Sequence, residues 1–251
     1  MIRLVRAEFT KLRTTRLVYG VAAVMAAFGV LTVVANATSA GQQGNPPLSA
    51  DSFPMLVAAP VRHTLLAGVT LLLGIPGMTG EFRHQTVTQT FLVTPDRGRV
   101  VAAKLVAYPL AGIALAVTTL AVTAAVATGW LAAKGITPSL LDARLGRVVG
   151  VALLGAGLCG LVGVGVAALV RNQVAALVGV VVWVLLVEGL LMSLLNVPSL
   201  GRWLPSAAAK AAITSPGGAQ LSRLAGTLVL AGYALALALV GTRLVVRRDI
   251  T

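Results

Sequence analysis

The most constraining feature of the sequence is a series of long apolar stretches separated by short polar connections. A membrane-spanning helix needs about 20 apolar residues, because a bilayer core is about 30 Å thick and only an intrahelical ladder satisfies backbone groups in lipid. Six stretches of the 251-residue chain meet this requirement. They cover residues 17–36, 57–78, 105–127, 148–170, 174–195 and 224–242. The sequence therefore predicts an all-α integral membrane protein with six transmembrane helices.

The composition argues against a soluble protein. The chain is 57% hydrophobic and 11% charged, whereas soluble domains are about 45–50% apolar and about 25% charged. The net charge of +13 would suggest nucleic acid in a soluble chain. Here the basic residues flank apolar runs and do not alternate with aromatic residues on one face, so we expect no nucleic-acid partner. The single cysteine, Cys159, lies in an apolar run and is predicted to be a packing residue.

Orientation follows from the positions of Lys and Arg in the short connections. A cytoplasmic N-terminus places the larger share of these residues inside, so both termini are predicted to be cytoplasmic. The basic residues ahead of the first span weigh most, and they are Arg3, Arg6, Lys11, Arg13 and Arg16. The first apolar run is longer than the core of a signal peptide, so we expect it to be retained. Abundant Arg, Ala, Gly and Val are typical of a GC-rich bacterial genome and predict a multi-pass protein of the bacterial cytoplasmic membrane.

The first 16 residues form a patterned segment of their own. Ile2, Val5, Phe9 and Leu12 recur at helical spacing. This pattern predicts an amphipathic helix in the cytoplasmic interface, with its basic residues attracted to anionic lipid. Those residues are Arg3, Arg6, Lys11 and Arg13. The alternative is a basic anchor that fixes topology without forming a helix.

The connection 80–104 is predicted to be cytoplasmic and to contain a short helix. That helix would begin at Thr79 or Gly80, carry Glu81 in its first turn, and end before Pro95. Its apolar side chains would be exposed unless a partner covers them, which is typical of an interface. The alternative is a solvated loop whose bases only fix topology.

Two other connections are informative. The connection after the fourth span is only "RNQ", so the fourth and fifth spans should form a tight hairpin. The segment 196–223 is rich in alanine and is interrupted by Pro198, Pro205 and Pro216, which predicts short half-helices at the outer interface.

The sequence contains no motif for catalysis. Phosphate-binding loops, HExxH, CxxC and GxSxG patterns are all absent, so we expect no enzymatic activity in this chain. The two histidines, His63 and His84, fall near opposite ends of the second predicted span, which argues against a shared metal site.

A single carboxylate, Glu188, lies within the fifth predicted span. Ionisable residues inside a membrane are candidates for a functional role, such as proton relay or substrate binding. The alternatives are a structural hydrogen bond to another helix and a position nearer the interface.

Two stretches closely resemble the permease subunits of type-2 ABC exporters, the bacterial family of many small drug, antibiotic and sodium efflux permeases. They are "RAEFTKLRTTR" before the first span and "GEFRHQTVTQTFLVTPDRGRVVAAKLVA" after the second. The G-E-[FY]-R-x-x-T pattern and the closing T-P-x-R occur in family order, as do the six spans and the long last outer connection.

The resemblance implies a role for each of these segments. Residues 2–13 would form the interface helix, 81–93 a coupling helix that inserts into a separate ATPase subunit, and 196–223 the re-entrant outer helices. Positions implied for ATPase coupling are Glu81, Phe82, Arg83, His84 and Thr86. The resemblance also implies a second permease subunit and two partner ATPase chains that carry the ATP and Mg, with no cofactor in this chain.

Three functional hypotheses follow from the sequence. The first is the permease subunit of an ATP-driven exporter with an unidentified substrate. The second is a proton-coupled secondary carrier that uses Glu188, although no inverted repeat is evident. The third is a membrane scaffold or immunity protein that transports nothing.

Overall fold

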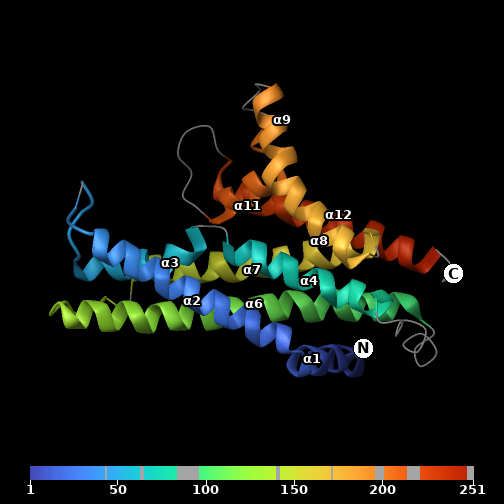
Figure 1. Cartoon of the computed structure of the whole chain (residues 1–251), viewed down its shortest axis with the longest axis horizontal. Coiled ribbons are helices and arrows are strands. Elements are labelled where there is room, and N and C mark those ends of the chain that lie inside the picture. The colour runs from blue at the N-terminus through green and yellow to red at the C-terminus, as the bar shows by residue number, and fades with distance from the viewer. Residues whose placement is uncertain are drawn as a thin grey trace.

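The protein is built of helices, most of which run along one long axis (Figure 1). The computed structural model describes residues 1–42, 44–62, 65–83, 96–139, 142–170, 172–195, 201–213 and 221–247, and every regular element in these ranges is helical. Five helical segments are long and apolar enough to cross a membrane. They are Arg16–Ser39, Arg97–Ala133, Ala143–Val170, Gln173–Leu191 and Arg223–Val245. The expectation of an all-helical, multi-pass membrane protein is confirmed.

Two helices form the start of the chain. α1 (Ile2–Thr14) and α2 (Arg16–Ser39) meet at Thr15, whose extended backbone, φ −87° and ψ 121°, changes the chain direction between them. Figure 1 shows α1 toward the end of the molecule where α12 (Arg223–Arg247) ends. The predicted helix at the N-terminus is therefore present, and it packs against α6 (Arg97–Ala133).

The predicted second span, 57–78, is not one long helix among the described residues. It falls on α3 (Phe53–Arg62), which follows the short turn η1 (Ala50–Ser52), and on α4 (Leu65–Arg83). Residues 63 and 64, including His63, lie outside the described residues. Both helices pack against α6 and α7 (Ala143–Val170). The structure thus has five long apolar helices among the described residues, and the prediction of a sixth span at 57–78 is not confirmed.

α6 is much longer than the predicted span 105–127. It begins at an N-cap, Asp96, whose side chain accepts a hydrogen bond from the Arg99 backbone N–H at 3.2 Å. Its 37 residues extend over about 55 Å at 1.5 Å per residue. Because a bilayer core is about 30 Å thick, α6 reaches beyond it.

Glycines bring the backbones of α4 and α7 together. A Cβ atom added at Gly163 would lie 2.1 Å from the Leu71 carbonyl oxygen, and one at Gly74 would lie 2.6 Å from the Gly160 carbonyl oxygen. Small residues at such spacing allow close helix packing in membranes, where apolar side chains gain little by leaving lipid. This contact makes α7 the central helix, which also packs against α6 and α12 (Arg223–Arg247).

The helices on either side of the "RNQ" connection, α7 and α8 (Gln173–Val182), contact each other. The Asn172 side chain caps the start of α8 by accepting a hydrogen bond from the Ala175 backbone N–H at 3.0 Å. α8 continues through the π-helical turn η2 (Trp183–Val187) into α9 (Glu188–Leu195), and Figure 1 shows this arm leaning away from the other helices.

The segment between the last two predicted spans contains one described helix. α11 (Pro205–Ile213) starts at a proline, as expected for a short outer helix, and packs mainly against α12. Residues 196–200 and 214–220, with Pro198 and Pro216, lie outside the described residues.

Candidate functional site

Four charged side chains from three helices meet at the end of the molecule that carries the N-terminus. We name Glu8, Lys11, Glu81 and Lys104 the charge cluster. The Lys104 ammonium group donates hydrogen bonds to Glu8 Oε2 at 3.0 Å, to Glu81 Oε1 at 2.8 Å and to the Gly77 carbonyl at 2.9 Å. Lys11 donates to Glu8 Oε1 at 2.8 Å and to Glu81 Oε1 at 2.7 Å. The cluster thereby ties α1 to the end of α4 and to the start of α6.

The charges in the cluster balance, and its centre is buried. The Lys104 side chain is 1% exposed and the Glu8 side chain 5%. Three acceptors match the three N–H groups of an ammonium ion, so Lys104 is fully satisfied. Two carboxylates face two ammonium groups, which is the arrangement that a buried charge requires.

Two members of the cluster have shifted pKa values. Burial favours a lower pKa for Lys11, but its hydrogen bonds and attraction to Glu8 and Glu81 outweigh burial and raise its pKa. Burial favours a higher pKa for Glu81, but the charge of Lys104 and the hydrogen bonds from Lys104 and Lys11 lower its pKa. Both shifts favour the charged forms of Lys11 and Glu81.

The backbone next to the cluster depends on a glycine. The buried Tyr108 ring of α6 lies so close to Gly77 that an added Cβ would be 1.9 Å from Tyr108 Cζ. This close approach brings α6 onto α4 and places Lys104, one turn before Tyr108, within reach of the Gly77 carbonyl.

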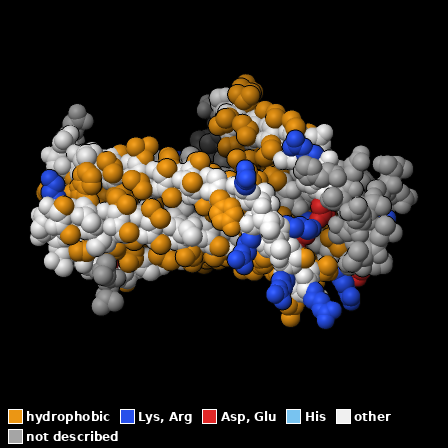
Figure 2. All heavy atoms as spheres, turned by 60° about the horizontal axis from the view of Figure 1, so that its bottom comes forward, with side chains coloured by type: hydrophobic (Ala, Val, Ile, Leu, Met, Phe, Trp, Pro, Cys, Tyr) orange, Lys and Arg blue, Asp and Glu red, His pale blue; other side chains and the backbone are white. Residues whose placement is uncertain are grey.

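Figure 2 shows Lys and Arg side chains gathered over this end, with acidic side chains among them, while apolar side chains cover much of the remaining face. Basic residues also occur at the opposite end of α6 and α7, where Lys134, Arg144 and Arg147 are exposed.

The structure corrects the predicted start of the coupling helix. α4 is continuous through Thr79 and Gly80, and Glu81 lies in its last turn, not in the first turn of a new helix. Thr79 is buried and its hydroxyl donates to the Ile75 carbonyl at 2.8 Å, as in a helix interior. The helix therefore continues through the first polar residues after the apolar run and does not end there.

The other residues assigned to ATPase coupling are only partly described. Arg83 is exposed and donates a hydrogen bond to Gln173 Oε1 at 3.2 Å, which links the end of α4 to the start of α8. His84 and Thr86 lie outside the described residues, as does most of the predicted coupling segment 81–93, and nothing is described of the Phe82 side chain.

The basic residues of the N-terminal helix divide into two groups. Arg3, Arg6 and Arg13 are exposed, whereas Lys11 joins the charge cluster. Phe9 packs against the core beside Leu12. The buried face of α1 thus contacts protein.

Sequence reasoning missed Glu8 and Lys104 as site residues. Glu8 stands three residues after Val5 and four before Leu12, so it lies on the apolar face of α1, where an unpaired acid would be costly. Lys104 directly precedes an apolar run of α6. The sequence positions of Glu8 and Lys104 could have marked them as candidates, but the structure is needed to show that their side chains meet.

Glu188 lies in a separate hydrogen-bonded group. Its carboxylate is buried and accepts hydrogen bonds from Trp183 Nε1 at 2.9 Å, from the Ser206 backbone N–H at 3.3 Å and from the Ser206 hydroxyl. Ser206 lies in the first turn of α11, where the helix dipole favours a negative charge. The structure therefore contains the hydrogen bond to another helix that was one of the alternatives for Glu188.

Within the described ranges, no group of three or more His, Cys, Asp or Glu side chains could hold a metal ion. Comparison of the sequence with protein-family models and with curated proteins gives no match.

Proposed function

We propose that this chain is the membrane-spanning permease subunit of an ATP-driven exporter that works with a separate ATPase subunit. The observation that carries the proposal is the charge cluster, which joins the N-terminal helix to the end of α4 where the predicted coupling segment begins. In this proposal the ATPase binds at the coupling segment. Closure of the ATPase then moves α4, and the cluster passes that movement to α1 and α6.

Buried ion pairs suit such a role because they hold helices in one defined arrangement and are costly to break. The Lys104 ammonium group contacts both other helices at once, through Glu8 of α1 and Glu81 of α4. The three helix ends would therefore move together.

The arm formed by α8, η2 and α9 supports a second permease subunit as partner. Only 11% of the Gln173–Leu191 span is buried, the lowest share among the five apolar spans. Large apolar side chains are exposed along it, including Val174, Val178, Leu185, Leu186, Leu190 and Leu194. In a membrane this surface contacts either lipid or a second copy of the chain. Formation of a dimer would bury it.

The proton-coupled carrier has less support from the geometry. All three groups that bond to Glu188 are donors, and together they fix the carboxylate against α11. A relay residue instead needs access to a water-filled path.

Copurification and reconstitution test the proposal. We expect a gene for an ATPase with a phosphate-binding loop beside the gene for this chain. The tagged chain is expressed with that ATPase, purified, and placed in liposomes, where ATP hydrolysis is measured with and without the permease. We expect the two proteins to copurify and the permease to change the rate of hydrolysis.

The variants Glu81→Gln and Lys104→Met should weaken this effect on hydrolysis while the ATPase remains bound. The matched control is Lys134→Met, which makes the same change at an exposed residue just after the other end of α6. Unchanged coupling in both cluster variants would contradict the role of the cluster. Transport by the isolated chain under a pH gradient, without any ATPase, would favour the carrier instead.

A further inference from the structure

We propose that the groove between α6, α7 and α12 binds one anionic phospholipid, with an acyl chain in the groove and the phosphate at Arg243. The groove has a volume of about 460 Å³ and is lined by Leu105, Leu161, Leu235, Ala238, Leu239, Thr242 and Arg243. This inference requires only that the chain lies in a membrane, so it does not rest on the proposed transport function.

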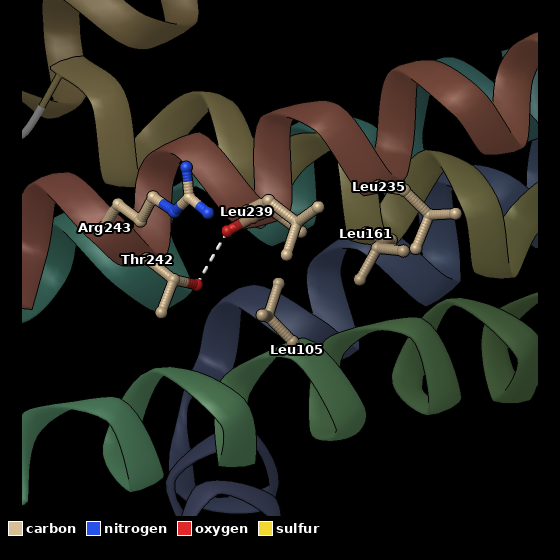
Figure 3. Close-up of a pocket in the computed structure, with 7 residues that line it drawn as sticks. Leu105, Leu161, Leu235, Leu239, Thr242 and Arg243 are labelled. Atoms are coloured by element: carbon tan, nitrogen blue, oxygen red, sulfur yellow. Dashed lines mark hydrogen bonds between the residues drawn. The ribbon is translucent and has the colours of Figure 1, made fainter.

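The lining is suited to a hydrocarbon chain. Figure 3 shows leucines from three helices around one gap, with Leu105 from α6, Leu161 from α7, and Leu235 and Leu239 from α12. The last two are 58% and 63% exposed, so the groove opens outward between helices and not into a closed core. A volume of about 300–1,000 Å³ is usual for small-molecule sites, and apolar lining with a few polar groups is their usual composition.

The polar groups of the groove are confined to one end. Thr242 and Arg243 follow Leu239 at the C-terminal end of α12, beyond the leucines (Figure 3). The Thr242 hydroxyl donates to the Ala238 carbonyl at 2.6 Å, which leaves its oxygen lone pairs as acceptors and Arg243 as the donor to an external group. Within the part of the chain that the structure describes, Arg243 takes part in no ion pair.

The position of Arg243 matches the head-group region of one leaflet. Leu105 directly follows Lys104, so the groove begins beside the charge cluster at the basic end of the molecule. The long arginine side chain can keep its guanidinium at the interface while its stem contacts apolar groups. A guanidinium binds phosphate oxygens through two parallel hydrogen bonds, which gives the site its preference for an anion.

A membrane lipid with a net negative head group meets both requirements in one molecule. Its acyl chain covers the leucines and its phosphate neutralises Arg243. A zwitterionic lipid offers the same chain but carries a compensating positive charge. The site should therefore bind phosphatidylglycerol more tightly than phosphatidylcholine, by about fivefold for one basic residue near the surface.

Native mass spectrometry of the detergent-purified chain tests this inference. The protein is mixed with equal amounts of phosphatidylglycerol and phosphatidylcholine with identical acyl chains, and the one-to-one adducts are compared. Arg243→Gln should lower the preference for phosphatidylglycerol about fivefold, and Arg243→Lys should retain part of it. The control Arg144→Gln removes an exposed arginine at the start of α7 and should leave the preference unchanged.

Two further measurements distinguish binding of the acyl chain from binding of the head group. Leu161→Trp fills the groove, so it should reduce adducts of both lipids without changing their ratio. Excess glycerol 3-phosphate, which has the head group without the chain, should not displace the lipid. Gel filtration of every variant confirms that it is folded.

An Arg243→Gln variant with the wild-type preference would overturn the proposal. An equal loss in Arg144→Gln would also overturn it, because the preference would then reflect overall charge. Undiminished adducts in Leu161→Trp would show that the acyl chain binds elsewhere. Displacement by glycerol 3-phosphate would point to a soluble phosphate as the ligand.

Discussion

Replacing Lys104 by Met should destabilise the protein strongly, although the new side chain has a similar length and suits a membrane. The Lys104 ammonium group makes two charged hydrogen bonds and one to a backbone carbonyl, with the lysine side chain 1% exposed. Each charged hydrogen bond contributes about 1.5–3 kcal/mol. Removing one partner of a buried pair typically costs about 3–5 kcal/mol, because the remaining charges stay buried. We therefore expect the free energy of unfolding to fall by about 3–5 kcal/mol.

The assay is equilibrium unfolding by SDS in mixed micelles, followed by circular dichroism. The control Lys134→Met should shift the free energy of unfolding by no more than about 0.5 kcal/mol, since that lysine is exposed.

A double-mutant cycle tests whether Lys104 and Glu8 stabilise the protein jointly. Glu8→Gln removes one of the acids that Lys104→Met leaves behind, so the two changes together should cost about 1–3 kcal/mol less than their sum. Strict additivity, or a Lys104→Met protein as stable as the control, would refute the argument that the cluster acts as one unit.

Two further predictions concern the same region. Gly77→Ala should cost about 1–3 kcal/mol in the same unfolding assay, because the added Cβ meets the buried Tyr108 ring, whereas Gly80→Ala, with nothing within 4 Å of its Cβ, should be neutral or slightly stabilising. The lowered pKa of Glu81 means that its contribution to the docking of α1 is present above pH 4.5 and is lost as the pH falls through the folded-state value. The raised pKa of Lys11 means that its contribution is present below pH 10.5 and is lost as the pH rises through its folded-state value. A fluorophore on the N-terminus should therefore report undocking of α1 at both extremes, and an acid transition that is unchanged in Glu81→Gln would contradict the Glu81 assignment.

Periodicity and hydropathy predicted most of the helices but not their ends. The apolar run 105–127 located α6, yet the helix starts at Arg97, where the Asp96 side chain caps it, and continues to Ala133 through the residues TGWLAA. Composition also did not show that α4 continues to Arg83, because the polar residues Thr79, Glu81 and Arg83 follow the apolar run.

The candidate site was predictable only in part. Glu81 was singled out for its place after a span, but its partners, Lys11 and Lys104, lie 70 residues before it and 23 residues after it in sequence. A local pattern contains no information about which of many basic residues meets a given acid, because that depends on how α1 folds back over α4 and α6. The close packing of glycine against Tyr108 was hidden for the same reason.

The glycine contact between α4 and α7 limits how this protein can change shape. With Gly163 so close to the Leu71 carbonyl, and Gly74 so close to Gly160, no side chain separates the two backbones. The two helices are already as near as their main chains allow, so this seam has no compressible layer. Any rearrangement there must be shear along the seam or its opening, and never a tightening.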